Sequence, residues 1–106
     1  MVTQKLDKKE YNILKKIANK LFASKYSGQT MEERLQAINF IKSELNTSKL
    51  LYNMEPEQAL GDRYVVCYLN IGEQMKTCHL LFDKFKKCPP LLIPSGVFEL
   101  NDSSSM

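Results

Sequence analysis

The spacing of the apolar residues changes once along the chain, and this change constrains the fold more than any other feature. Up to residue 45, apolar side chains recur three or four positions apart, which is typical of an amphipathic helix. From residue 63 onward they alternate with polar side chains, which is typical of a half-buried strand. Helices followed by strands predict an α+β fold, with helices packed on one face of a small antiparallel sheet.

Two helices are expected before the change of spacing. The first spans 3–26, with Thr3 as its N-cap and Ser27-Gly28 as its stop. The second begins at Thr30, because Thr30-Met31-Glu32-Glu33 is a capping-box pattern, and it ends at 46–48. The loop between them is short, so the two helices are expected to form an antiparallel helical hairpin.

The next segment, 49–62, lacks a clear period. Pro56 is suited to open a single helical turn and Gly61 to close it, so we expect a connector with one short turn. Val97 to Leu100 is expected to add a third strand. The globular domain therefore spans 1–100, and the polar residues 101–106 form a flexible tail.

A β-hairpin is expected over 63–82. Gly72-Glu73 fits a two-residue type II′ loop, which would place Cys67 directly opposite Cys78. One face of the hairpin is the more apolar and is expected to meet the helices; it carries Val65, Cys67, Leu69, Ile71, Cys78, Leu80 and Phe82. The other face is expected to stay open; it carries Tyr64, Val66, Tyr68, Met75, Thr77, His79 and Leu81.

The three cysteines and the single histidine are the residues closest to recognisable chemistry. Cys78 and His79 are adjacent, so on a strand they point to opposite faces and cannot bind one metal ion together. An odd number of cysteines without a secretory signal indicates a reducing compartment, so we expect cytoplasmic or nuclear localisation. The thiols are expected to pack in the core as small apolar groups, with no metal and no cofactor.

Catalysis is not expected from this chain of 106 residues. One histidine is the whole supply of imidazole bases, and no phosphate-binding glycine loop or metalloprotease motif is present. No apolar run is long enough to cross a bilayer, so no membrane association is expected.

The function expected is binding of another protein, as an adaptor, an inhibitor or a regulatory subunit. An antiparallel sheet covered by helices on one side leaves its other face uncovered, and tyrosine and methionine are enriched in interfaces. The candidate contact residues are Tyr64, Val66, Tyr68, Met75 and Leu81. The same face could instead close a homo-oligomer.

Nucleic-acid binding is the alternative, with single-stranded RNA as the ligand. Residues 1–26 contain seven lysines and two acids, whereas the whole chain has a net charge of +3. Tyr64 and Tyr68 project from one face, as base stacking requires. The lysines expected to contact phosphates are Lys8, Lys15, Lys16, Lys84, Lys86 and Lys87.

Overall fold

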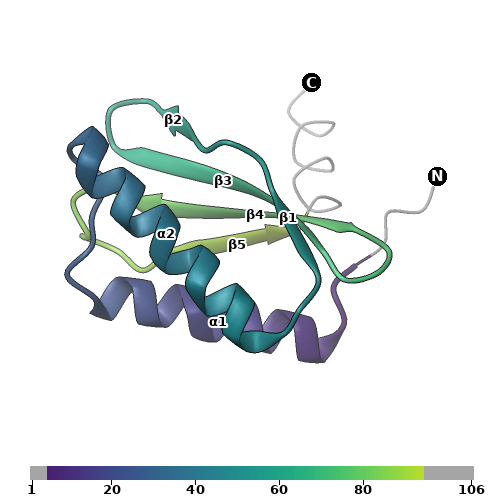
Figure 1. Cartoon of the computed structure of the whole chain (residues 1–106). Coiled ribbons are helices and arrows are strands. Elements are labelled where there is room, and N and C mark those ends of the chain that lie inside the picture. The colour runs from purple at the N-terminus through teal and green to yellow at the C-terminus, as the bar shows by residue number, and fades with distance from the viewer. Residues whose placement is uncertain (1–4, 95–106) are drawn as a thin grey trace, which may run out of the picture.

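The computed structural model describes residues 5–94, in which two helices precede five strands. These are α1 (Lys8–Ala23), α2 (Met31–Ser48), β1 (Tyr52–Met54), β2 (Gln58–Leu60), β3 (Tyr64–Ile71), β4 (Lys76–Asp83) and β5 (Leu91–Pro94). Every strand pairing is antiparallel (Figure 1). The α+β fold is confirmed. The expected strand at 97–100 and the expected tail lie outside the described residues.

Both helices begin at a capping box. At α2, the Thr30 hydroxyl accepts a hydrogen bond from the Glu33 amide and the Glu33 carboxylate accepts one from the Thr30 amide, both at 3.0 Å, as the sequence predicts. At α1 the N-cap is Asp7, so the expectation of Thr3 as N-cap is wrong. The Asp7 carboxylate accepts a hydrogen bond from the Glu10 amide at 2.8 Å, which satisfies one of the free amides of the first turn.

The sheet has the order β1-β3-β4-β5, and β2 lies beside β1 along the same edge of β3. Met54 pairs with Leu69 and Gln58 pairs with Val66, so the segment 54–58 contains one residue more than the stretch 66–69 of β3 that it faces. The extra residue is a β-bulge within one interrupted edge strand. The expected helical turn at Pro56 is therefore wrong. The backbone on both sides of Pro56 forms hydrogen bonds with β3 instead of the local hydrogen bonds of a helical turn.

The β3–β4 hairpin closes through four residues, Gly72 to Met75, so the expected two-residue loop is wrong. Gly72 and Met75 have φ of +80° and +51°, and the Met75 amide donates to the Gly72 carbonyl at 3.0 Å. The longer loop shifts the register by two residues. Cys67 consequently faces Leu80 and not Cys78, but each side chain within β3 and β4 keeps the face that was predicted, whereas Met75 lies in the loop.

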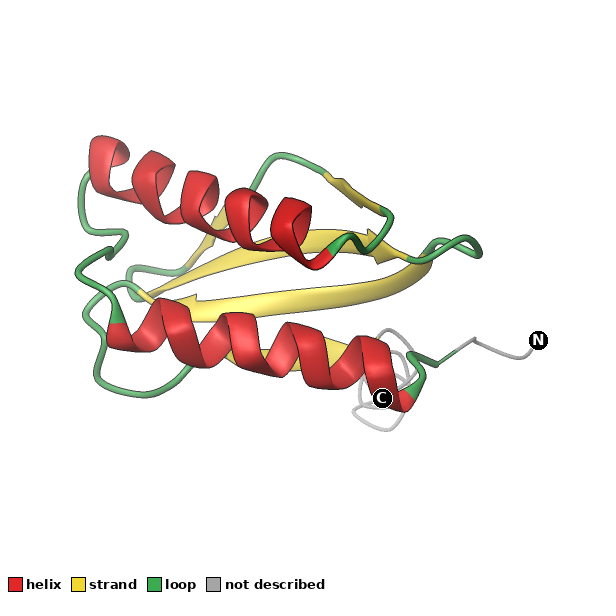
Figure 2. Ribbon diagram, turned by 60° about the horizontal axis from the view of Figure 1, so that its bottom comes forward, coloured by secondary structure: helices red, strands yellow, loops and turns green. Residues whose placement is uncertain are grey.

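Both helices cover the same face of the sheet (Figure 2). Their apolar stripes meet the inward side chains of β3 and β4 in one core, as the sequence predicts. The fully or nearly fully buried members from the helices are Leu14, Ile17, Ala18, Leu21, Ala37, Ile38, Ile41 and Leu45, and those from the sheet are Val65, Cys67, Leu69, Ile71, Cys78, Leu80 and Phe82. Neither of the two helices within residues 5–94 combines the length and apolar character of a membrane span.

Candidate interaction surface

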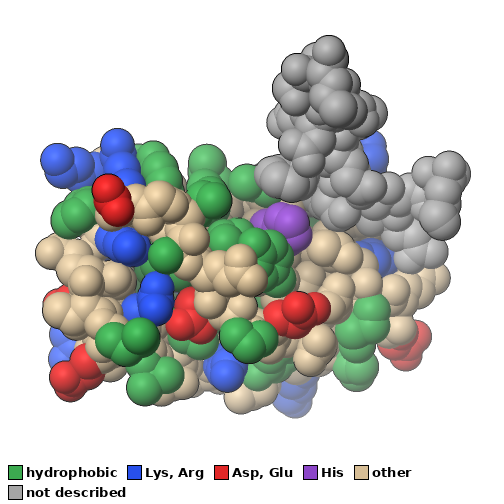
Figure 3. Space-filling view, turned by 90° about the horizontal axis from the view of Figure 1, so that it is seen from above, with side chains coloured by type: hydrophobic (Ala, Val, Ile, Leu, Met, Phe, Trp, Pro, Cys, Tyr) green, Lys and Arg blue, Asp and Glu red, His purple; other side chains and the backbone are tan. Residues whose placement is uncertain are grey.

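The face of the sheet that points away from the helices carries a group of apolar and aromatic side chains. Tyr64, Val66 and Tyr68 alternate along β3 with the positions that face the helices. Val66 is buried and the two tyrosines are half-buried, but none of the three belongs to the cluster beneath the helices. The register places Leu91 opposite Leu81 and brings β5 into the same group. We call this surface the open face; it consists of Tyr64, Val66, Tyr68, His79, Leu81, Leu91 and Ile93. Figure 3 shows hydrophobic side chains beside His79 on this side.

Polar contacts hold the two tyrosine rings of the open face. The Tyr68 ring meets the His79 ring edge-on, with centroids 4.8 Å apart and planes at 85°. The Tyr68 hydroxyl donates a hydrogen bond to Gln58 Oε1 at 3.5 Å. The Arg63 guanidinium lies 5.2 Å from the centre of the Tyr64 ring. The rings are therefore held in place before any partner binds.

Polar side chains border the open face. Asn53 of β1 pairs with Asn70 of β3, and Thr77 of β4 donates its hydroxyl to Asn70 Oδ1 at 3.2 Å. Gln58 of β2 adds an amide at the same side of the sheet. An apolar centre with a polar border is the usual composition of a protein–protein contact surface.

Four of the five residues expected to bind a partner lie on the open face: Tyr64, Val66, Tyr68 and Leu81. Met75 lies in the hairpin loop, where its side chain is 42% exposed, and it is separated from the other four. The sequence reasoning missed Leu91 and Ile93, because the strand that presents them was not expected. The short apolar run Leu91-Leu92-Ile93 that follows Pro89-Pro90 is the signal that could have indicated this strand.

The cysteines on the covered face are buried and free, as expected. Burial raises the pKa of Cys67 to about 12, with a smaller contribution from the charge of Glu57. Burial raises the pKa of Cys78 to about 11, against the lowering effect of a hydrogen bond to the Ile93 backbone. Both thiols are therefore protonated at neutral pH, when a thiol is neither a nucleophile nor a metal ligand.

His79 is partly buried on the other face, and this burial lowers its pKa. It lies across the sheet from both buried thiols, so no cysteine–histidine pair forms there. Within residues 5–94, no group of three or more His, Cys, Asp or Glu side chains is arranged to hold a metal ion.

Asp83 is a buried carboxylate that the sequence did not reveal. It accepts hydrogen bonds from Nε and Nη2 of Arg63, both at 3.0 Å, from the Phe85 amide at 2.9 Å and from the Lys87 amide at 3.2 Å. Burial alone would raise its pKa, but the Arg63 and Phe85 hydrogen bonds and the Arg63 charge together lower it. The ionised carboxylate fastens the segment after β4 to the start of β3.

The lysines expected to bind nucleic acid do not gather around the tyrosines. Lys8, Lys15 and Lys16 lie on α1, which covers the sheet face opposite to Tyr64 and Tyr68. The three lysines after β4 also differ among themselves. Lys86 turns back and donates to the Ser24 carbonyl, and its burial lowers its pKa; Lys84 is half-buried and Lys87 is exposed.

The chain matches no protein-family model, no curated protein and no solved structure. The geometry of the described residues is therefore the basis for a functional proposal.

Proposed function

We propose that this protein is a small noncatalytic interaction module, an adaptor, inhibitor or regulatory subunit, that binds another protein through its open face. One observation carries the proposal: the helices cover a single face of the sheet, and the opposite face has its own apolar group outside the core. Leu91 is 55% exposed at one side of this group. Apolar side chains gathered on one surface of a small protein are typical of a contact site.

The open face is suited to bind with a modest ordering cost. Full burial of an exposed large apolar side chain contributes roughly 1.5–3 kcal/mol, and the half-buried members of the open face would add a part of this each to the contribution of Leu91. The Tyr68 and Tyr64 rings are already held by His79, Gln58 and Arg63, so little side-chain freedom is lost on binding. Tyrosine and arginine are also the residues that most often dominate binding energy.

Docking onto the face is favoured over addition of a partner strand to the β1–β2 edge. The segment between β1 and β2 contains Glu55, Pro56 and Glu57 and includes the bulge. Proline, charge and bulges are the features that prevent an edge strand from pairing with another chain.

A photocrosslinking experiment tests this proposal. A photoreactive amino acid replaces Leu91 on the open face, or Leu35 on α2 as the matched control, because these leucines are 55% and 58% exposed. After irradiation in nuclease-treated extract from the native source, we expect one protein to be crosslinked from position 91 and not from position 35. Equal crosslinking from both positions, or crosslinking from 35 alone, would contradict the proposal.

Variants then separate binding from folding. We expect Tyr68→Asp and Leu81→Asp to abolish capture of the crosslinked partner while thermal unfolding stays cooperative. If either variant unfolds, the single change Leu91→Asp provides the same test at a side chain that is more than half exposed. Retained capture by a folded Leu91→Asp variant would place the interface elsewhere. Crosslinking of two copies of this chain would identify a homo-oligomer instead of a separate partner.

A further inference from the structure

The solvent side of α1 is basic along its whole length. Lys8, Lys9, Lys15, Lys16 and Lys20 are all exposed, whereas Glu10, the single acid of this helix, is buried. Glu10 is also neutralised, because Lys76 Nζ donates to its Oε1 at 3.0 Å. The exposed surface of α1 therefore has five positive charges and no negative charge.

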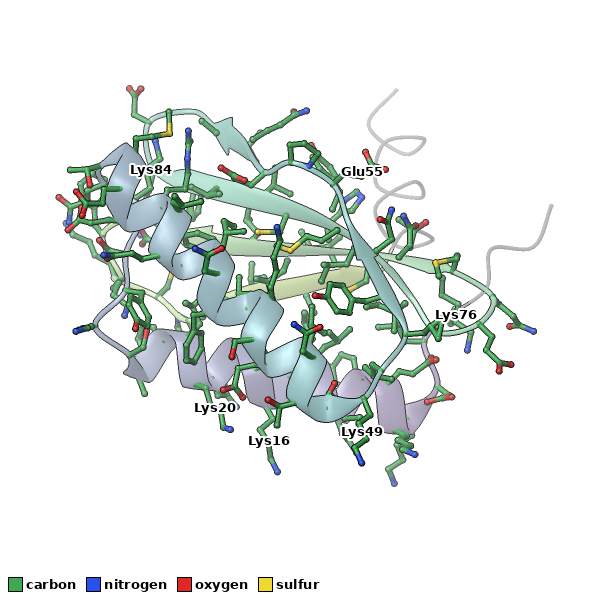
Figure 4. The ribbon with its side chains drawn as sticks, viewed as in Figure 1. Lys16, Lys20, Lys49, Glu55, Lys76 and Lys84 are labelled. Atoms are coloured by element: carbon green, nitrogen blue, oxygen red, sulfur yellow. The ribbon has the colours of Figure 1, made fainter. Side chains whose placement is uncertain are left out.

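A groove of about 340 Å³ runs between α1 and α2 beside these lysines. Ile13 and Ile17 provide its apolar lining, Lys16 and Lys20 line it from α1, and Glu44 and Thr47 line it from α2. Its size is sufficient for one or two side chains of a ligand. Figure 4 shows Lys16 and Lys20 pointing away from the sheet, on the side opposite to Glu55.

The charges beside the groove are accessible to a ligand. Lys20 Nζ lies 3.0 Å from Glu44 Oε1, but the two side chains are 53% and 24% exposed, so this surface ion pair contributes little. Lys16 forms no ion pair with any residue in the part of the chain that the structure describes. An incoming carboxylate can therefore bind Lys16 directly and compete with Glu44 for Lys20.

One acidic residue, Glu44, lines this groove, and it is paired with Lys20. Glu32 and Glu33 lie at the other end of α2, in its first turn, away from the groove. Glu55 lies on the opposite side of the molecule from Lys16 and Lys20 (Figure 4). This separation of charge would orient a negatively charged ligand towards the helices during approach.

We propose that the α1–α2 groove is a second binding site, for an acidic peptide segment that carries an apolar side chain. The apolar side chain would pack on Ile13 and Ile17, and the carboxylates of the segment would bind Lys16 and Lys20. The isoleucine lining favours a peptide over a nucleic-acid backbone, which offers phosphates but no apolar group to fill the groove. This site lies on the helical side of the sheet, so it does not depend on the function proposed for the open face.

The test uses a synthetic peptide in which leucines recur at helical spacing among glutamates, and a control peptide with glutamine at every glutamate. Amide chemical shifts of the full chain are followed during titration at low salt. We expect saturable shifts at Ile13, Lys16, Lys20 and Thr47 with the acidic peptide, and none with the control. The amides of the open face should not move.

Charge-removing variants locate the site on α1. The double change Lys16→Gln and Lys20→Gln should weaken binding by about tenfold or more, since the peptide then loses both charged contacts that position it in the groove. The matched change Lys8→Gln and Lys15→Gln removes the same charge from the same helix outside the groove, and should weaken binding by less than about threefold. Equal losses in both variants would indicate a diffuse positive charge and overturn the proposal.

Two further probes exclude other ligands. A duplex DNA of random sequence and vesicles containing phosphatidylserine are titrated under the same conditions. Tight binding of either one, together with no saturable peptide binding, would overturn the proposal. A peptide that shifts only the open face would overturn it as well. Thr47→Phe fills the groove at an exposed position, so a folded Thr47→Phe protein that binds the peptide as well as wild type would also contradict it.

Discussion

Oε2 of Glu10 occupies the space that a side chain at Gly72 would need. A β-carbon built on Gly72 would lie 2.5 Å from this oxygen. The other carboxylate oxygen of Glu10 accepts hydrogen bonds from Lys76 Nζ at 3.0 Å and from the Asp7 amide at 2.9 Å. The start of α1 is thereby fixed against the β3–β4 hairpin, and Gly72 is the residue that permits the close approach.

Gly72→Ala should therefore destabilise the protein more than Gly61→Ala. Both glycines have positive φ, +80° and +67°, and this conformation alone costs a non-glycine residue roughly 1–2 kcal/mol. An added β-carbon at Gly61 meets nothing within 4 Å, so only that cost applies there. At Gly72 the displacement of Glu10 adds to it. Urea unfolding of the two variants measures the difference.

A double-mutant cycle identifies the source of this difference. In a Glu10→Ala background, Gly72→Ala should cost about as much as Gly61→Ala, because the carboxylate is no longer in the way. An unchanged gap between the two glycine variants would show that Glu10 is not the cause.

Stability should fall in acid because of Asp83. Its pKa in the folded state is below the ordinary value of 3.8, so the unfolded state takes up the proton first as the pH falls. The contribution of Asp83 to the free energy of unfolding is complete above the ordinary pKa of 3.8, and it is lost as the pH falls through the lower folded-state pKa. Asp83→Asn should be less stable at neutral pH and should depend less on acid pH. Denaturant unfolding across the acid range tests this, with Asp62→Asn as the same change at an exposed side chain. An unchanged acid dependence in Asp83→Asn would refute the assignment.

One thiol should react much faster than the other two. Cys88 is partly exposed, whereas Cys67 and Cys78 are buried, with pKa values raised to about 12 and about 11. A coloured thiol reagent added to the native protein should modify Cys88 first, and the other two only after denaturant is added. Cys88→Ser should remove the fast phase. A fast phase that remains in Cys88→Ser would mean that the covered face of the sheet opens readily.

Thr30→Ala should destabilise the protein by about 1 kcal/mol, because loss of the N-cap leaves the Glu33 amide without its acceptor. Thr47→Ala is the control, since Thr47 is exposed on the same helix and its hydroxyl only bonds back to the Ser43 carbonyl. Thermal unfolding should show a clear loss for the first variant and little change for the second. Equal melting temperatures for Thr30→Ala and wild type would rule out a contribution from the cap.

The elements that depend on local signals were predictable from the sequence. The capping box at Thr30 defines the start of α2, and the alternation along β3 and β4 assigns each side chain to its face, including Cys67 and His79. The separation of the thiols from the imidazole followed from that alternation alone. This prediction is correct although the predicted register is wrong, because a shift of two residues leaves the faces unchanged.

The elements that depend on distant partners were not predictable. β1 and β2 have three residues each, and they are strands only because β3 offers its free edge to them. The hairpin loop is longer than Gly72-Glu73 alone suggests, since the Gly72 amide donates to the Leu51 carbonyl at 2.8 Å and Met75 adopts positive φ. The sequence around Asp83 has no recognisable pattern, because one of its partners, Arg63, precedes β3 and another, Phe85, follows β4.

The extra residue between β1 and β2 bears on which changes of length this chain can tolerate over evolutionary time. Met54 points to the helices, whereas Gln58, an even number of positions later, points away from them. Removal of a single amino acid from 55–57 would restore strict alternation and leave Gln58 opposite Val66, so that Ala59 would still be directed inward and Leu60 outward. Related proteins that are one amino acid shorter here should therefore keep the hydrophobic pattern at 58–60, and those that are two shorter should show the opposite pattern.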